Sequence, residues 1–164
     1  MTNSVAIHQP KQSSNPVTLA LQDVLASTYG LLLSTHNYHW NVEGKNFIPL
    51  HKLFEGQYTE LFEAVDEIAE RIRALGDYAL PFEGSDIMDV SKMTSNALNK
   101  ETHADERASR MVHNLIMLNQ AVIEKCQFAK DSSRKANDDE TENLMVTRVT
   151  VHQKALWMLN SIAK

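Results

Sequence analysis

Residues 39–55 read HWNVEGKNFIPLHKLFE and place two histidines, His39 and His51, on either side of a predicted turn. Residues 43–45 (EGK) have a glycine at their centre and separate two long segments of helical apolar periodicity, which indicates a break between helices. The two histidines are symmetric about Lys45, so folding one segment back onto the other sets them side by side. The stretch therefore predicts a helical hairpin with a pair of imidazoles near its turn.

The rest of the chain predicts a single all-α domain. The 164 residues include five glycines and four prolines, and most of these lie between the periodic segments. We expect a mobile tail over residues 1–15 and one bundle domain over residues 16–164. Long helices are predicted over residues 17–41, 46–76, 100–130 and 141–162. Asn15 and Pro16 have the chemistry of a helix start, and Gly76 that of a helix end.

The connection between the second and third helices is long. Residues 77–99 contain Pro81 and Gly84, and the segment 85–93 (SDIMDVSKM) predicts one short helix. Antiparallel neighbours need only a few connecting residues, so this length predicts a crossover along the bundle. Residues 131–140 (DSSRKANDDE) predict the turn before the last helix. Four long helices with one long crossover favour a ferritin-like four-helix bundle over a simple up-and-down one.

Apolar residues at helical spacing give the expected core. The predicted stripes and further core residues are Leu21, Val24, Leu25, Thr28, Leu31, Leu32 and Thr35; Leu50, Leu53, Phe54, Leu61, Val65, Ile68, Ile72 and Leu75; Ala108, Met111, Leu115, Leu118, Val122 and Ile123; and Met117, Trp157 and Met158.

Composition also limits the compartment and the partners. Cys126 is the only cysteine, which excludes an intramolecular disulfide and is compatible with a reducing compartment. The sequence shows neither a secretory leader pattern nor an uninterrupted apolar run of membrane-spanning length, so we expect a cytoplasmic protein without membrane contact. The formal net charge of −5 disfavours the whole surface as a footprint for nucleic acid.

Acidic residues of the second predicted helix are further candidate ligands beside the histidine pair. His51, Glu55, Asp66 and Glu70 fall on one slowly drifting stripe together with Phe62. Any one of these carboxylates is most simply a solvated residue, and we expect that role for the glutamates at positions 60, 63 and 67. Asp66 and Glu70 are one turn apart and can face one ion. His51 and Asp66, however, are about 22 Å apart along a straight helix, too far to share a metal within one chain.

A two-fold axis removes this difficulty. If the second helix packs antiparallel against its own copy, centred between Glu60 and Leu61, His51 lies opposite Glu70 and Glu55 lies opposite Asp66. Imidazole and carboxylate ligands suit iron(II), zinc or manganese. Glutamate precedes none of the seven histidines by three residues, which disfavours a di-iron site inside the bundle. Metal chemistry is therefore predicted between subunits.

These motifs resemble those of a known family. HWNVEGKNFIPLHKLFE, followed by VDEIAERIRALGDYA at residues 65–79, resembles the paired signatures of the Dps family of mini-ferritins, the DNA-binding proteins from starved cells. HQKALWML at residues 152–159 is similar to the last helix of that family. The resemblance covers residues 17–163.

The resemblance implies a dodecameric shell and an inter-subunit ferroxidase centre. His39, His51 and Glu55 would come from one subunit, and Asp66 and Glu70 from its two-fold mate. Such proteins oxidise iron(II), preferably with hydrogen peroxide, and store ferric mineral, which protects the cell from oxidative damage; zinc or another divalent ion can take the place of iron. Members of the family often have aspartate at the position of Glu55, so its role as a direct ligand stays open.

Alternatives follow from the same residues. A nucleoid-associated, DNA-binding protein is the second hypothesis, although the tail offers only Lys11 and His8 as basic side chains. A helical scaffold with vestigial ligands is the third. Trp40 is either a packing residue or a redox residue, and the acidic turn at residues 138–140 is more simply solvated than part of an iron-entry pore. His36 is expected to be a surface or hydrogen-bonded residue; His8, His103, His113 and His152 belong to no constellation that the sequence defines.

Overall fold

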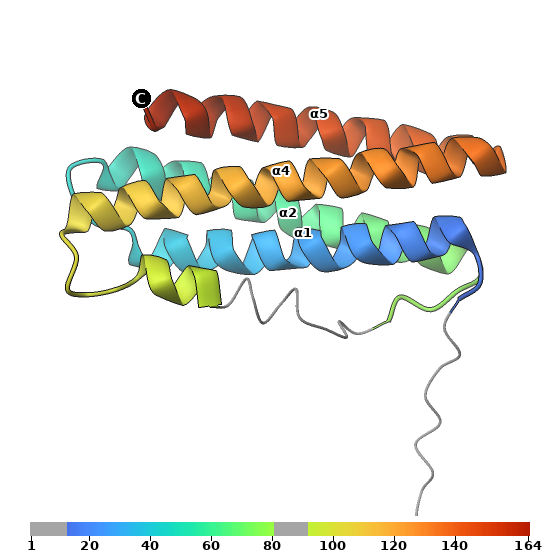
Figure 1. Ribbon diagram of the computed structural model, residues 1–164, viewed down its shortest axis with the longest axis horizontal. Coiled ribbons are helices and arrows are strands. Elements are labelled where there is room, and N and C mark those ends of the chain that lie inside the picture. The colour runs from blue at the N-terminus through green and yellow to red at the C-terminus, as the bar shows by residue number, and fades with distance from the viewer. Residues whose placement is uncertain (1–12, 81–91) are drawn as a thin grey trace, which may run out of the picture.

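The computed structural model describes residues 13–80 and 92–164, and these residues form a bundle of helices (Figure 1). The long elements are α1 (Pro16–Asn41), α2 (Phe47–Ala74), α4 (Ala104–Ala136) and α5 (Asp139–Ile162). A short helix over residues 92–97 precedes α4. The all-α architecture predicted from periodicity is confirmed.

The helices form two antiparallel hairpins that lie side by side. α1 packs against α2, α4 packs against α5, and α1 and α4 join the two hairpins. Figure 1 shows that α2 and α4 run in the same direction, so the chain between them returns along the length of the bundle. This parallel pair is the reason for the long crossover, because a tight turn joins only antiparallel neighbours.

Local chemistry sets the helix ends. Asn15 caps α1 by accepting a hydrogen bond from Val17 N at 2.9 Å, with Pro16 in the first turn, as predicted. α2 ends before Gly76, whose φ of 90° favours glycine. Asp138 caps α5 through Thr141 N at 3.0 Å. The predicted turn at residues 131–140 is wrong in its first half, because α4 continues to Ala136 and stops where Asn137 adopts a left-handed φ of 56°.

The crossover helix also departs from its predicted position. It covers residues 92–97, whereas the prediction was 85–93, of which residues 85–91 lie outside the described part of the chain. Ser34 Oγ lies 2.8 Å from Thr94 Oγ1, and Asn114 Nδ2 donates to the carbonyl of Met93 at 3.3 Å. These bonds join the short helix to α1 and α4. The predicted tail lies mostly outside the described residues too, although Ser13 Oγ donates to Asp77 at 2.6 Å.

The predicted stripes pack together between the helices. Leu21, Val24, Leu31, Leu50, Phe54, Ile68, Ile72, Met111, Leu115 and Val122 are all buried. Two core predictions are wrong in the single chain: the side chains of Met117 and Trp157 are 59% and 67% exposed. Both lie on helix faces that no other described element covers. Met111 is buried as predicted.

The apolar character of α1 comes from its place in the bundle. By length and composition α1 is apolar enough to cross a membrane, but 61% of its most apolar window is buried inside the bundle. Burial against α2 and α4 is a sufficient reason for this composition.

Candidate metal centre

The turn between α1 and α2 is held by α4. Gly44 has a φ of 96°, a conformation that residues with a Cβ rarely adopt. Asp105 Oδ1 accepts a hydrogen bond from Lys45 N at 2.9 Å, and a Cβ on Gly44 would overlap this same oxygen. Glu43 forms an ion pair with Arg107, also on α4. The glycine is therefore required both for the backbone conformation and for the contact with α4.

The hairpin brings His39 of α1 and His51 of α2 together, as the sequence predicts. Their rings stack with centroids 3.9 Å apart and an interplanar angle of 20°. His39 Nδ1 lies 3.0 Å from the carbonyl oxygen of His51, and His51 Nδ1 lies 2.9 Å from the carbonyl oxygen of His39. A carbonyl oxygen only accepts, so each Nδ1 carries the proton and donates. In the neutral imidazoles both Nε2 lone pairs are then free, which is the tautomer that a metal ligand needs.

Aromatic side chains surround this pair. The ring of Tyr58 meets the ring of His39 edge to face at a centroid distance of 5.1 Å. His36 stacks on Tyr58 at 4.2 Å and also contacts Trp40 at 4.1 Å. His36 is thus a half-buried packing residue behind the histidine pair. Sequence spacing alone missed Tyr58, although it lies one helical turn from Glu55 on the same helix.

Glu55 extends the pair by one turn of α2. Its carboxylate accepts a hydrogen bond from Lys52 Nζ at 2.8 Å. This bond and the Lys52 charge lower the pKa of Glu55, and the nearby His39 and His51 act in the same direction. The carboxylate is therefore ionised at neutral pH and lies on the helix that carries His51. The structure thus brings two imidazoles together at the hairpin and places one carboxylate a helical turn further along α2.

The other predicted ligands lie elsewhere on the same chain. Asp66 and Glu70 are exposed on α2, and about 22 Å of helix axis separates Asp66 from His51. Within residues 13–80 and 92–164, three or more histidine, cysteine, aspartate or glutamate side chains never gather closely enough to hold a metal ion. The single chain thus presents two separate sets of candidate ligands, one at the turn between α1 and α2 and the other further along α2.

The surface around these ligands is unusually apolar. Phe62, on the stripe between Glu55 and Asp66, is 69% exposed, and Trp40, next to His39, is 63% exposed. Ile48 is exposed in the first turn of α2. Large apolar side chains gathered on one face indicate a surface that another protein covers. The incomplete ligand sets and the apolar residues share this face.

A second polar cluster lies inside the bundle, and sequence analysis missed it. His152 Nδ1 is 2.8 Å from Asn119 Oδ1, and Asn119 Nδ2 donates to the carbonyl of Leu115 at 2.8 Å. The Asn119 oxygen therefore accepts, so His152 carries its proton on Nδ1. Arg148 Nη2 donates to His152 Nε2 at 3.3 Å. Both nitrogens of this imidazole are occupied.

Arg148 joins the cluster to α2. Its guanidinium binds both carboxylate oxygens of Glu60, with Nη2 to Oε2 at 3.1 Å. Glu60 was predicted to be simply solvated, and that prediction is wrong. Burial, and then the nearby Arg148 charge, lower the pKa of His152 to about 3, so this histidine is neutral at physiological pH. Both nitrogens of His152 have partners, so the cluster offers no free lone pair of this histidine to a metal; the buried Nε of Arg148 has no acceptor among the described residues.

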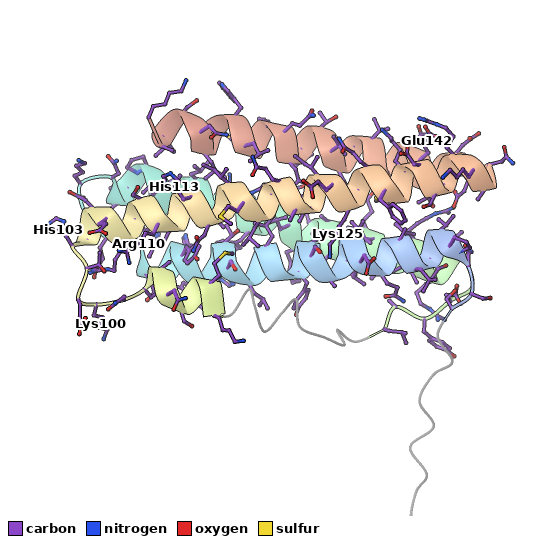
Figure 2. The ribbon with its side chains drawn as sticks, in the orientation of Figure 1. Lys100, His103, Arg110, His113, Lys125 and Glu142 are labelled. Carbon is purple, nitrogen blue, oxygen red and sulfur yellow. The ribbon has the colours of Figure 1, made fainter. Side chains whose placement is uncertain are left out.

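Two further histidines and two acidic residues have structural partners. His103 caps α4 by accepting from Asp105 N at 3.3 Å, and His113 Nδ1 donates to the carbonyl of Ser109 at 2.9 Å. Figure 2 shows both toward the N-terminal end of α4, and Glu142 at the opposite end of the bundle. There Arg134 Nε donates to Glu142 at 3.0 Å. In the predicted acidic turn, Arg71 Nη2 donates to Asp138 at 2.7 Å.

Comparison with known proteins identifies relatives over nearly the whole chain. A family model for the ferritin-like domain matches residues 18–164. A DNA protection during starvation protein of Brevibacillus brevis is 30% identical over 145 residues, which cover 88% of this chain and 93% of the relative. An uncharacterized low temperature-induced protein of Nostoc is 35% identical over 153 residues, which cover 92% of this chain and 81% of the relative.

Solved structures agree with this match. Dps from Thermosynechococcus elongatus superimposes with a TM-score of 0.75 at 26% identity, covering 90% of each chain. The Dps protein of Vibrio cholerae, described as a member of a broad superfamily of ferritin-like diiron-carboxylate proteins, gives a TM-score of 0.72 at 26% identity over 99% of this chain and all of the other.

Proposed function

Since this chain belongs to the Dps family of ferritin-like proteins, we propose that it oxidises iron(II) and stores the ferric product. The oxidation takes place at centres shared by two copies of the chain, with hydrogen peroxide as the oxidant. The observation that carries this proposal is the reciprocal hydrogen bonding of His39 and His51, which leaves two Nε2 lone pairs adjacent and free. Twelve copies would form the storage shell.

The two half-sites have complementary chemistry. His39 and His51 supply neutral nitrogen ligands that suit ferrous iron. Asp66 and Glu70 of a second copy, together with Glu55, supply anionic oxygens that favour the harder ferric product. Two iron(II) ions each lose one electron, the O–O bond of one peroxide breaks, and two protons complete the reduction to two waters. Hydrolysis of the iron(III) produced returns protons to solvent.

The exposed apolar face supports the shared site. An antiparallel pair of α2 helices would cover Phe62 and bring each His51 toward Glu70 of the other copy. One contact would thus bury the apolar side chains and complete two centres. The relationship to ferritin-like diiron-carboxylate proteins supports iron as the metal oxidised.

The direct test uses the assembled full chain without air. Iron(II) is added, hydrogen peroxide starts the reaction, and ferric absorbance is followed by stopped flow. His51→Ala and Asp66→Asn should each abolish rapid oxidation while the assembly size in light scattering stays unchanged. Unchanged kinetics in both variants would contradict the assignment.

Mixed assemblies test the sharing between copies. When His51→Ala and Asp66→Asn chains are unfolded together in equal amounts and reassembled, half of the pairs are mixed. Each mixed pair has one centre with both ligands altered and one intact centre, so about a quarter of the wild-type rate should return. A site confined to one chain would give no recovery.

DNA binding is the second candidate, because several relatives carry the name DNA protection during starvation protein. We propose that removal of iron(II) and peroxide is the main protection, since the acidic net charge opposes phosphate contact. A low-salt gel-retardation assay, with and without residues 1–15, distinguishes the two. A shift that depends on the tail would establish direct binding.

A further inference from the structure

A cavity of about 340 Å³ separates α2 from α5. These two helices make few contacts, because α2 packs mainly on α1 and α5 mainly on α4. Glu60 and His152 line the cavity. It lies on a different part of α2 from the apolar face that carries Phe62. Its volume falls in the range of small-molecule sites, about 300–1,000 Å³.

Gly56 at the cavity is the first indication of a ligand. Glycine inside a helix is destabilising relative to alanine, so a mid-helix glycine usually has a packing or functional reason. No described residue supplies that reason, since a Cβ built on Gly56 meets nothing within 4 Å, and its φ is not positive. Gly56 is exposed, so the space beside it is open to a molecule from outside this chain.

Gln57, the next residue, gives a second and independent indication. Its Nε2 is buried and donates to no acceptor in residues 13–80 or 92–164. Leaving a buried donor unpaired destabilises the folded chain, so native proteins rarely keep one without an acceptor. Gln57 lines the cavity, and a ligand oxygen seated there would supply the missing acceptor.

The charges at the cavity favour an anion. Two exposed lysines, Lys52 and Lys154, line it, and Lys154 pairs with no acidic residue of the described chain. The carboxylate of Glu60 also lines it, but both of its oxygens are bound by Arg148. His152 is neutral because burial lowers its pKa to about 3. Lys52 already pairs with Glu55, so Lys154 supplies the positive charge without a described acidic partner at the cavity.

The wall is apolar, which narrows the class of anion. It consists of Leu53, Leu61, Val151, Ala155 and Met158. A small inorganic oxyanion would leave these carbon atoms without contacts. A hydrocarbon chain would cover them and remove their apolar surface from water, which favours binding.

We propose that the cavity between α2 and α5 binds a small amphiphilic monocarboxylate. The carboxylate lies at Lys154 and Lys52 and accepts a hydrogen bond from the Gln57 amide, and the hydrocarbon part lies along Val151 and Met158. This site shares no residue with the proposed iron centre, although Lys52 pairs with Glu55, and it needs no iron.

The test measures octanoate binding to the iron-free full chain by calorimetry and by the carbonyl signal of carboxyl-labelled octanoate in NMR. Octanoate should bind saturably, whereas acetate, octylamine and inorganic phosphate should not. Gly56→Leu, which fills the cavity from an open position, should abolish binding. Lys52→Gln combined with Lys154→Gln should weaken it about tenfold. Lys135→Gln, an exposed lysine at the far end of α4, is the matched control and should have no effect.

Several outcomes would overturn the proposal. These are an absence of saturable octanoate binding, equal binding of phosphate, or wild-type affinity in both Gly56→Leu and the lysine double variant. Loss of assembly in Gly56→Leu with no binding to the wild type would instead show that a second copy fills the space. Circular dichroism and light scattering verify that each variant is folded and assembled. Iron oxidation does not enter the measurement, so failure here leaves the proposed ferroxidase function standing, and the reverse also holds.

Discussion

Two groups of histidines in this molecule have the same ingredients and opposite chemistry. At the hairpin turn, His39 and His51 each donate Nδ1–H to the other's carbonyl and keep Nε2 free. In the bundle, His152 has Asn119 on one nitrogen and Arg148 on the other. Carboxylates lie near both groups: Glu55 near the first, Glu60 near the second.

The difference lies in which partners the fold supplies. Backbone carbonyls hold the hairpin histidines from behind, so their outward nitrogens stay available to a cation. A guanidinium already takes the cation's place beside His152 and Glu60. A histidine near a carboxylate is thus a metal site only where its second nitrogen has no partner. Four changes test this comparison.

The largest effect is expected at the hairpin. His51→Ala should slow peroxide-driven iron(II) oxidation by about 100-fold or more, because even the groups behind a metal ligand contribute about 10–100-fold. His152→Gln should leave the rate of the assembled protein near wild type. Stopped-flow absorbance measures both. Equal losses in the two variants would show that the two groups are not chemically distinct.

The second effect concerns the buried ion pair. Arg148→Met should lower the free energy of unfolding by about 3 kcal/mol, because it leaves Glu60 without its charge partner and His152 without a donor. Glu60→Gln should cost at least as much, since it leaves the Arg148 guanidinium, whose side chain is only 3% exposed, without a counter-charge. Denaturant unfolding at one protein concentration measures both. A double-variant cycle with no coupling energy would mean that the pair contributes nothing.

The third effect is a pH dependence that belongs to His152 alone. Its pKa in the folded chain is about 3, whereas in an unfolded chain it is about 6.5. As the pH falls below about 6.5, His152 is protonated in the unfolded chain but stays neutral in the folded chain. The free energy of unfolding therefore falls, by about 2 kcal/mol at pH 5.

The matched variant isolates this titration. His152→Gln removes the group, so the stability difference between wild type and variant should shrink between pH 7 and pH 5. The titration of the carboxylates is common to both proteins and cancels. Parallel stability curves would show that His152 is protonated in the folded state, and therefore that it is not held neutral by burial and Arg148.

Sequence analysis reached the parts of the fold that local chemistry sets. Asn15 and Pro16 at the start of α1, and Gly76 after α2, mark helix ends by cap and backbone preference. The end of α4 was missed because residues 131–136 are polar and resemble a loop, yet Ser133 is buried and its hydroxyl donates to the carbonyl of Ala129 at 2.6 Å. Only the neighbouring helix decides whether such a segment stays helical.

The histidine pair of the candidate metal site was predictable from the sequence, whereas the buried cluster around His152 was missed. The spacing of His39 and His51 about the turn suffices to bring them together. Arg148 and His152 lie on the buried stripe of α5 with Met145, Ala155 and Leu159, and polar residues at core spacing were the available signal. The role of Asp66 and Glu70 as metal ligands stays a prediction, because the histidines expected opposite them belong to a second copy.

The smallest effect concerns the backbone that sets the hairpin pair. Gly44→Ala should lower the free energy of unfolding by about 1–2 kcal/mol, because the residue needs a φ of 96° and its new Cβ would displace Asp105 from Lys45 N. Gly56→Ala is the matched control within α2, where open space and helical backbone should make alanine stabilising by up to about 1 kcal/mol. Thermal unfolding compares them. If Gly44→Ala also slows iron oxidation while Gly56→Ala does not, the hydrogen-bonded geometry of His39 and His51 is what makes this pair a metal site. Full oxidation by a destabilised Gly44→Ala would show that the two imidazoles reach the metal without their exact register at the turn.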